Sequence, residues 1–188
     1  MSKGKLTVIT GCMFAGKTDT LIYLINKERY RQRDIYCFKP QKDIRYSDTK
    51  IISHNKTEQS AIPVNSSIDI DNQLNQIRQH QTKPISIAIE EIQFFDQAIA
   101  PLCSSLARDG VRVFVSGLDL DSFGHPFGPM PELLAYADEV IKLHAQCAIC
   151  GKDARRSYRK PNAPDMVVHI GGTESYDPRC IDCWKSEI

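Results

Sequence analysis

The stretch Gly11-Cys12-Met13-Phe14-Ala15-Gly16-Lys17-Thr18 decides the fold. It matches the pattern GxxxxGK(S/T), directly follows the apolar run 6–10, and directly precedes residues 17–31, whose apolar residues recur with helical spacing. A phosphate-binding loop requires this setting, because its glycines let successive backbone N–H groups surround phosphate oxygens at the start of a helix. Lys17 supplies a cation and Thr18 a hydroxyl ligand for Mg²⁺. The motif predicts a nucleotide site, but it does not specify the reaction.

The rest of the first 144 residues alternates between strand and helix patterns. Short, β-branched-rich runs of strand length occupy residues 35–38, 85–89, 111–116 and 140–143, and helical spacing recurs over residues 70–79 and 97–108, the last ended by Gly110. Such alternation predicts an α/β fold with a mainly parallel sheet of doubly buried strands and helices on both faces. The polar stretch 41–67 is the longest candidate for an irregular loop.

A change of pattern after residue 144 predicts a second, smaller unit. Hydrophobic runs become sparse and two CxxC pairs appear, Cys147 with Cys150 and Cys180 with Cys183, separated by the 29 residues 151–179. Four thiolates from two such turns form a closed tetrahedral shell, which predicts a structural Zn²⁺. We therefore expect an ATP-binding domain over residues 1–144 and a zinc-binding lobe over residues 145–188. The single cysteines, Cys12, Cys37 and Cys103, lie in apolar surroundings that favour ordinary packing.

Charge and hydropathy narrow the classes of partner. The 188 residues include 24 basic and 23 acidic side chains, which leaves no overall positive field to attract nucleic acid or anionic lipid. The N-terminal residues lack a signal-peptide pattern, and no segment approaches the roughly 20 apolar residues that span a bilayer. We expect a cytoplasmic protein that binds small ligands and neither membrane nor nucleic acid. The basic stretch 155–164 leaves open the alternative that the lobe is a nucleic-acid-binding zinc ribbon.

Two adjacent carboxylates, Glu90 and Glu91, follow the predicted strand 85–89. The carboxyl ends of parallel strands open onto the ligand crevice, where Mg²⁺ and a catalytic base belong. Neighbouring residues on a strand point to opposite faces, so we expect separate roles, one toward the metal and one toward the phosphate acceptor. A solvated acidic turn is the alternative for this pair taken alone.

Further motifs along nearly the whole chain are similar to those of thymidine kinases of the zinc-containing, cytosolic type. Beside the phosphate loop and the cysteine pairs, the matching segments are Lys39-Pro40, Asp43-Ile44-Arg45-Tyr46-Ser47, Ser53-His54, Glu91-Ile92-Gln93-Phe94-Phe95, Gly117-Leu118-Asp119, Pro126-Phe127-Gly128, and Ile170-Gly171-Gly172 with Tyr176. This family is distinct from the viral and mitochondrial deoxynucleoside kinases. The resemblance implies a P-loop NTPase fold of the RecA-like type.

The resemblance also implies the reaction and the roles of individual residues. Members of this family transfer the γ-phosphoryl group of ATP to the 5′-hydroxyl of thymidine, giving dTMP and ADP for nucleotide salvage and DNA synthesis. By similarity, Glu91 is the catalytic base, and Arg45 joins Lys17 and the loop amides at the phosphates. Thr18, Asp43 and Glu90 hold Mg²⁺. The implied nucleoside-binding residues are Phe94, Phe127, Ile170, Gly171, Gly172 and Tyr176, the last on a loop covering the base. Members are typically homotetramers inhibited by dTTP.

The sequence departs from the family pattern at two positions. Glu90 stands where the family usually has Asp, and Ser122 stands where it commonly has Phe, with Phe123 one position later. Either that loop is shifted by one residue or the base pocket differs. Two alternatives to the kinase remain: an ATPase driven by nucleic acid bound to a zinc ribbon, and a regulatory relative that binds nucleotide without turnover.

Overall fold

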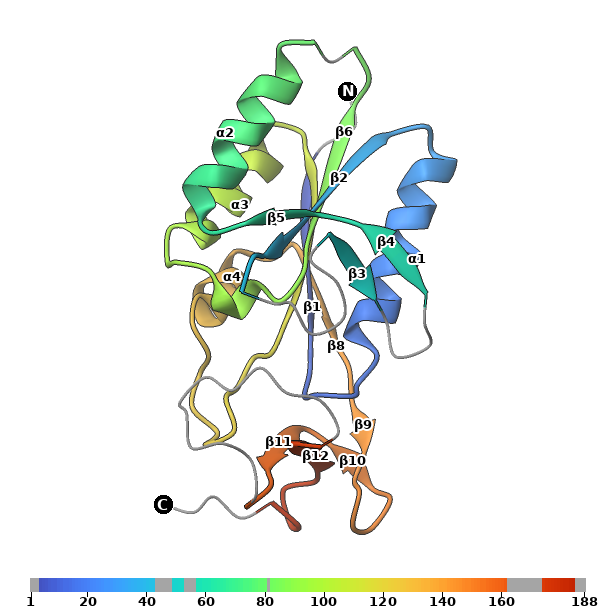
Figure 1. Ribbon diagram of the computed structural model, residues 1–188, viewed down its shortest axis with the longest axis vertical. Helices are drawn as coiled ribbons and strands as arrows, with labels where there is room; N and C mark the ends of the chain where they lie inside the picture. The colour runs from blue at the N-terminus through green and yellow to red at the C-terminus, as the bar shows by residue number, and fades with distance from the viewer. Residues whose placement is uncertain (1–3, 43–48, 53–56, 81, 162–173, 185–188) are drawn as a thin grey trace.

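A parallel sheet forms the centre of the computed structural model, which describes residues 4–42, 49–52, 57–80, 82–161 and 174–184. Its six strands lie in the order β5-β2-β6-β7-β1-β8 (Figure 1). Their bounds are β1 Lys5–Thr10, β2 Asp34–Pro40, β5 Ile62–Val64, β6 Ile85–Ile89, β7 Arg112–Gly117 and β8 Glu139–Lys142. Every described pairing in this sheet is parallel, which confirms the fold class that the sequence predicts.

Helices cover both faces of the sheet, as the alternating pattern predicts (Figure 1). They are α1 Lys17–Tyr30, α2 Ser67–Arg78, α3 Ile99–Arg108 and α4 Met130–Tyr136, with a short 3₁₀ turn, η1, at Ile92–Phe94. On one face Leu21 and Ile25 of α1 pack against Ile9 and Phe114 of the sheet. The three other helices pack into a larger core on the opposite face. Two apolar layers therefore fix the sheet, and with it the loops at its carboxyl edge.

Local sequence signals begin and end these helices. Ser66 caps α2, because its side chain accepts from the Asp69 N–H while the Asp69 carboxylate accepts from the Ser66 N–H. In α3 the buried residues Ile99, Cys103 and Leu106 recur with helical spacing. Burial raises the pKa of the Cys103 thiol to about 12, as for Cys37 in β2. Both thiols are therefore packing groups, as their apolar surroundings predict.

Two expectations about strands need correction. Residues 41–67 are not one irregular loop: the segment contains an antiparallel pair, β3 Lys50–Ile52 with β4 Glu58–Ser60, followed by the sheet strand β5. Each strand has only three residues, too few to produce a readable hydrophobic period. Strand β8 is not doubly buried: it lies at the edge of the sheet, where β1 is its one partner among the described strands, and Val140 is 45% exposed.

A buried carboxylate ties α1 to the sheet. Glu28 is fully enclosed, and its oxygens lie 2.7 Å from Arg31, 3.4 Å from Arg33 and 3.1 Å from Arg112. It also accepts a 3.0 Å hydrogen bond from the Ser86 hydroxyl. A buried charge needs such partners, since an unpaired one would cost several kcal/mol. The cluster lies at the amino end of the sheet, away from the loops that follow the strands.

The chain after the sheet forms two small antiparallel pairs. These are β9 Ala145–Gln146 with β10 Asp153–Ala154, and β11 Arg156–Arg159 with β12 Tyr176–Arg179. They lie together beyond the carboxyl ends of β1 and β8 (Figure 1). Among the described residues, no helix is long and apolar enough to cross a membrane.

Candidate functional site

The phosphate loop joins β1 to α1, in the setting that the sequence predicts. Gly11 has φ 145°, and a side chain there would collide with the backbone oxygen of Leu143. Gly16, the N-cap of α1, has the left-handed φ of 81°, which glycine adopts without steric cost. These two glycines bend the loop around the amino end of α1, where backbone N–H groups are available to an anion.

Lys17 is the first residue of α1, and its side chain bonds back to the loop. Its Nζ donates a 2.8 Å hydrogen bond to the Cys12 carbonyl oxygen. Burial lowers the pKa of Lys17, and the negative charges of Glu91, Asp119 and Glu90 oppose that effect. Acidic groups from the ends of two further strands thus lie near the ammonium group. The structure therefore brings the loop and the predicted acidic strand end together.

Glu90 and Glu91 follow β6 and bond to different partners, Thr18 and Gln93. β6 ends at Ile89, and Glu91 has the left-handed φ of 51°. Glu90 is buried and its Oε1 accepts a 2.7 Å hydrogen bond from the Thr18 hydroxyl. A hydroxyl and a carboxylate oxygen side by side at the phosphate loop are the ligand types that Mg²⁺ prefers.

Gln93 holds the carboxylate of Glu91. Its Nε2 donates a 2.5 Å hydrogen bond to Glu91 Oε2, and its Oε1 accepts a 3.1 Å hydrogen bond from the Leu118 N–H. Gln93 is buried, so both ends of its amide are used inside the protein. The sequence predicts no role for Gln93. Its one signal is its place in the motif with Glu91 and Phe94, two residues after Glu91. Gln93 fixes Glu91 relative to the end of β7.

The structure describes three aromatic residues that are predicted at the nucleoside, Phe94, Phe127 and Tyr176. The rings of Phe94 and Phe127 meet edge to face with centroids 5.7 Å apart. Tyr176 is buried as the first residue of β12. Phe123 is 41% exposed and its ring stacks on that of His125 with an angle of 28° between the planes, whereas Ser122 is half-buried. The other predicted site residues, Asp43, Arg45, Ile170, Gly171 and Gly172, lie outside the described residues.

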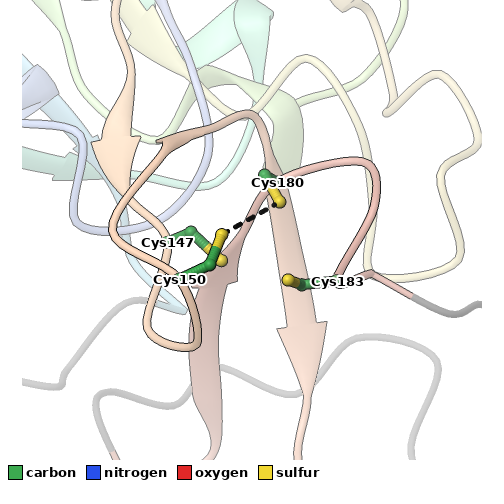
Figure 2. A group of neighbouring side chains, drawn as sticks. All are labelled: Cys147, Cys150, Cys180 and Cys183. Atoms are coloured by element: carbon green, nitrogen blue, oxygen red, sulfur yellow. Dashed lines mark hydrogen bonds between the residues drawn. The ribbon is translucent and has the colours of Figure 1, made fainter.

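The four cysteines of the two CxxC pairs converge, as Figure 2 shows. Their sulfur atoms all lie within 4.8 Å of one another, and those of Cys150 and Cys180 are 3.6 Å apart. Both turns have the same backbone bond: the Gly151 N–H donates to Cys147 at 2.9 Å, and the Trp184 N–H donates to Cys180 at 2.9 Å. Two matching turns thus present two thiols each to one point.

This arrangement fits zinc. Four sulfurs at about 2.3 Å from a tetrahedral Zn²⁺ lie roughly 3.8 Å from one another, which agrees with the observed spacing. All seven cysteines of the chain are free thiols. Backbone N–H groups of Cys180, Cys150 and Ile149 lower the pKa of Cys147 to about 6, which favours the thiolate that binds metal. The shell is complete with four cysteines, so the site is suited to a structural ion.

A further contact joins the metal lobe to the phosphate loop. The Met13 N–H donates a 3.0 Å hydrogen bond to Ser157 Oγ on β11, and Ser157 is only 4% exposed. The sequence predicts no role for Ser157, because its partner Met13 lies 144 residues earlier in the chain.

Comparison with solved structures supports the fold. The sulfate complex of the genome packaging NTPase B204 from Sulfolobus turreted icosahedral virus 2 superposes with a TM-score of 0.51 and 16% identity, over 77% of this chain and 76% of that one. The ATPase domain of G40P gives a TM-score of 0.51 and 12% identity, over 77% of this chain and 71% of that one. At such identities the likeness concerns the fold alone.

Sequence relatives are much more similar. The thymidine kinase of Bacteroides fragilis is 40% identical over 186 residues, covering 99% of this chain and 89% of the relative. That of Bacteroides thetaiotaomicron is 39% identical, covering 97% and 87%, and that of Rhodothermus sp. is 39% identical, covering 98% and 83%. The family model described as thymidine kinase matches residues 4–184. With a match over nearly its whole length, this chain belongs to the thymidine kinase family.

Proposed function

We propose that the protein transfers the γ-phosphoryl group of ATP to the 5′-hydroxyl of thymidine, giving dTMP and ADP. Membership of the thymidine kinase family supports this activity. The observation that carries the chemistry is the 2.7 Å hydrogen bond from Thr18 to Glu90, which joins the phosphate loop to an acidic strand end. Phosphoryl transfer depends on positioning and charge neutralisation, and these groups provide both.

The loop Gly11–Thr18 binds the phosphates of ATP. Its backbone N–H groups face an anion at the start of α1, and the Lys17 ammonium adds a full charge. Burial lowers the pKa of Lys17, so a phosphate oxygen beside it would favour the protonated form and gain a strong interaction. Arg45 is proposed as a second cation for the transferred group.

Magnesium fits between the loop and the end of β6. Thr18 and Glu90 would hold it, with Asp43 proposed as a further contributor. Bound there, the ion would neutralise charge on the β- and γ-phosphates. Glu90 is one methylene longer than the usual Asp, and its direct hydrogen bond to Thr18 supports a place for its carboxylate at the loop.

Glu91 is the proposed base. Its carboxylate would accept the proton of the thymidine 5′-hydroxyl as that oxygen bonds to the γ-phosphorus and ADP leaves. Gln93 donates to Glu91 Oε2, and this hydrogen bond supports a fixed orientation of the proposed base. Glu90 bonds to Thr18 and Glu91 to Gln93, and these different partners support separate roles for the two carboxylates.

The nucleoside is proposed to lie beside Phe94 and Phe127, whose rings meet edge to face. Phe94 stands three residues after Glu91 in the same motif. An aromatic wall suits a pyrimidine ring, since stacking needs only a flat apolar surface. Tyr176 and the segment Ile170-Gly171-Gly172 are proposed to complete the pocket from the C-terminal lobe.

The organisation of the whole protein is proposed from the same reasoning. The sheet ends at β8 and the cysteine turns follow, which supports a division into residues 1–144 and 145–188. The four cysteines support structural zinc. A homotetramer in the cytoplasm is proposed from the family resemblance, and analytical ultracentrifugation of the purified protein tests the oligomeric state.

The nucleic-acid-dependent ATPase has less support. Cations of the basic stretch already have partners within the lobe: the Arg156 guanidinium lies over the Trp184 ring, 5.7 Å from its centroid, and Lys160 Nζ lies 3.0 Å from Asp177. Cations occupied in this way contribute less to a surface for phosphate backbones.

One assay distinguishes the two functions. Purified protein is incubated with ATP, Mg²⁺ and each common deoxynucleoside separately, with and without single-stranded DNA, and both ADP and deoxynucleoside monophosphate are measured. The kinase yields equal amounts of dTMP and ADP with thymidine, unaffected by DNA. ADP without monophosphate, raised by DNA, would replace the kinase with the ATPase.

A further inference from the structure

The phosphate loop and the metal lobe share one apolar cluster. Cys12 of the loop is buried together with Cys147 and Cys180, two of the four metal-site cysteines, and with Ala145 and Ala154 of β9 and β10. Phe14 and Ala15 of the loop pack against the same cluster, as does Cys183. The loop that would bind ATP therefore lies directly on the core that the four cysteines hold together.

Two hydrogen bonds reinforce this contact. The Met13 N–H donates to Ser157 Oγ at 3.0 Å, and the Cys12 thiol donates to the Ala154 carbonyl at 3.3 Å. Consecutive residues of the loop are thus each held by a strand of the metal lobe, Cys12 by β10 and Met13 by β11.

The metal site fixes the position of Ser157. Ser157 lies opposite Pro178 in the β11–β12 pair, and Cys180 follows at the end of β12. The first cysteine turn attaches at the same place, because the Ala148 N–H donates to the Pro178 carbonyl at 2.9 Å. Both cysteine turns therefore meet at the strand that faces Ser157, and a bound ion would hold them there.

The loop needs such support because its backbone is strained. Phe14 has φ 65°, a left-handed conformation that costs a non-glycine residue free energy. The Phe14 side chain is in contact with the shared cluster, so its burial there offsets part of that cost. Without the lobe in place, the segment would be free to relax from the shape that directs its N–H groups toward an anion.

We propose that the metal lobe holds the phosphate loop in its nucleotide-binding shape, with Ser157 as a positioning residue, so that zinc and ATP bind cooperatively. This inference rests on the proposed ATP site. Coupling between two sites is reciprocal: zinc must raise nucleotide affinity by the same factor by which nucleotide raises zinc affinity. The contact links the sites by direct packing, so no long pathway through the sheet is needed.

The first test uses the wild-type protein. ADP affinity is measured by calorimetry with zinc bound and after removal by a chelator, and zinc affinity is measured by competition with a chromogenic chelator, with and without ADP. We expect zinc removal to weaken ADP binding about tenfold, within the roughly 5- to 150-fold range typical of coupled sites. ADP should strengthen zinc binding by the same factor.

The second test uses Ser157 variants that keep zinc. Ser157→Ala removes the acceptor of the Met13 N–H, whereas Ser157→Thr keeps a hydroxyl. We expect Ser157→Ala to bind one zinc but to bind ADP more weakly. Its KM for ATP should rise several-fold with little change in kcat. Ser157→Thr should keep the ADP affinity of the wild type. Ile149→Ala, an exposed site between two metal cysteines, is the matched control and should leave ADP affinity unchanged.

The outcomes separate the two proposals. ADP affinity that is unchanged by chelation and by Ser157→Ala would overturn the coupling and leave the ATP site standing. A Ser157→Ala variant that changes only the KM for thymidine would equally overturn it. A zinc-loaded wild type that binds no adenine nucleotide would overturn the ATP site, and the coupling with it.

Discussion

The hydroxyl of Thr18 donates a hydrogen bond to Glu90 Oε1 at 2.7 Å, although the two residues are 72 positions apart. The bond joins the first turn of α1 to the residue after β6. Strand β1, which leads into α1, is separated from β6 in the sheet by β7. A short alcohol and a carboxylate held together at a phosphate loop form the start of a magnesium site. Several predictions about catalysis depend on this pair and on its neighbour Glu91.

Thr18→Ala and Glu90→Gln should each lower kcat at least ~100-fold, because a catalytic metal contributes several kcal/mol of charge stabilisation. Thr18→Ser and Glu90→Asp keep the ligand atoms and should retain most activity. The measurement is kcat as a function of Mg²⁺ concentration. Equal activity of Glu90→Gln and wild type would remove Glu90 from the metal site.

Glu91→Gln should lower kcat by about 10²- to 10⁴-fold, the usual contribution of a general base, with ADP affinity unchanged. Gln93→Ala should have a smaller effect in the same direction, because it frees Glu91 without removing the carboxylate. Single-turnover kinetics and ADP calorimetry measure the two effects. A loss of ADP binding in Glu91→Gln would show that this carboxylate acts on the nucleotide instead of the acceptor.

Cys150→Ser should remove zinc from the protein, and native mass spectrometry should detect one ion in the wild type and none in the variant. Trp184, the only tryptophan of the chain, reports on the lobe because it lies against Gly124 and Arg156. Its emission should move to longer wavelength as the lobe opens. Cys103→Ala, in the core between α3 and the sheet, should keep the ion.

Glu28→Gln should lower the free energy of unfolding by about 3 kcal/mol, because it leaves the buried Arg33 guanidinium and the half-buried Arg112 guanidinium without their carboxylate. Arg33 is 8% exposed at its side chain, and burial lowers its pKa, so it depends on Glu28. Urea denaturation measures the change. Glu139→Gln, whose ion pair with Lys5 is solvent-exposed, should cost less than about 1 kcal/mol.

Asp96→Asn should make the free energy of unfolding less dependent on pH in the acid range. Burial opposes ionisation of Asp96, but hydrogen bonds from the Ser67 N–H and hydroxyl and the Ala98 N–H outweigh it and lower its pKa. A carboxyl with a depressed pKa stabilises the fold above its unfolded value of about 3.9 and loses that contribution as the pH falls through the folded pKa. Wild type should therefore be more stable than the variant at pH 7, and the two should converge in strong acid. A constant difference across that range would contradict the assignment.

The sequence alone determined the features that are encoded locally. The phosphate loop, the alternation of strands and helices, the acidic pair after β6 and the two CxxC turns each occupy a few consecutive residues with distinctive side chains. Glycines at Gly11 and Gly16, an apolar run before them and a helical pattern after them are sufficient to predict a nucleotide fold. Chelating turns of cysteine likewise predict a metal from spacing alone.

Only the tertiary structure decided how these parts meet. The strands β3, β4 and β5 are too short to show a period, so their place depends on their pairing, β3 with β4 and β5 with β2. Gln93 can orient Glu91 because its amide is also bonded to the Leu118 N–H after β7. Ser157 meets Met13 because the metal lobe packs on the phosphate loop. Contacts between distant segments follow from the packing of the whole chain, and a local pattern contains no information about them.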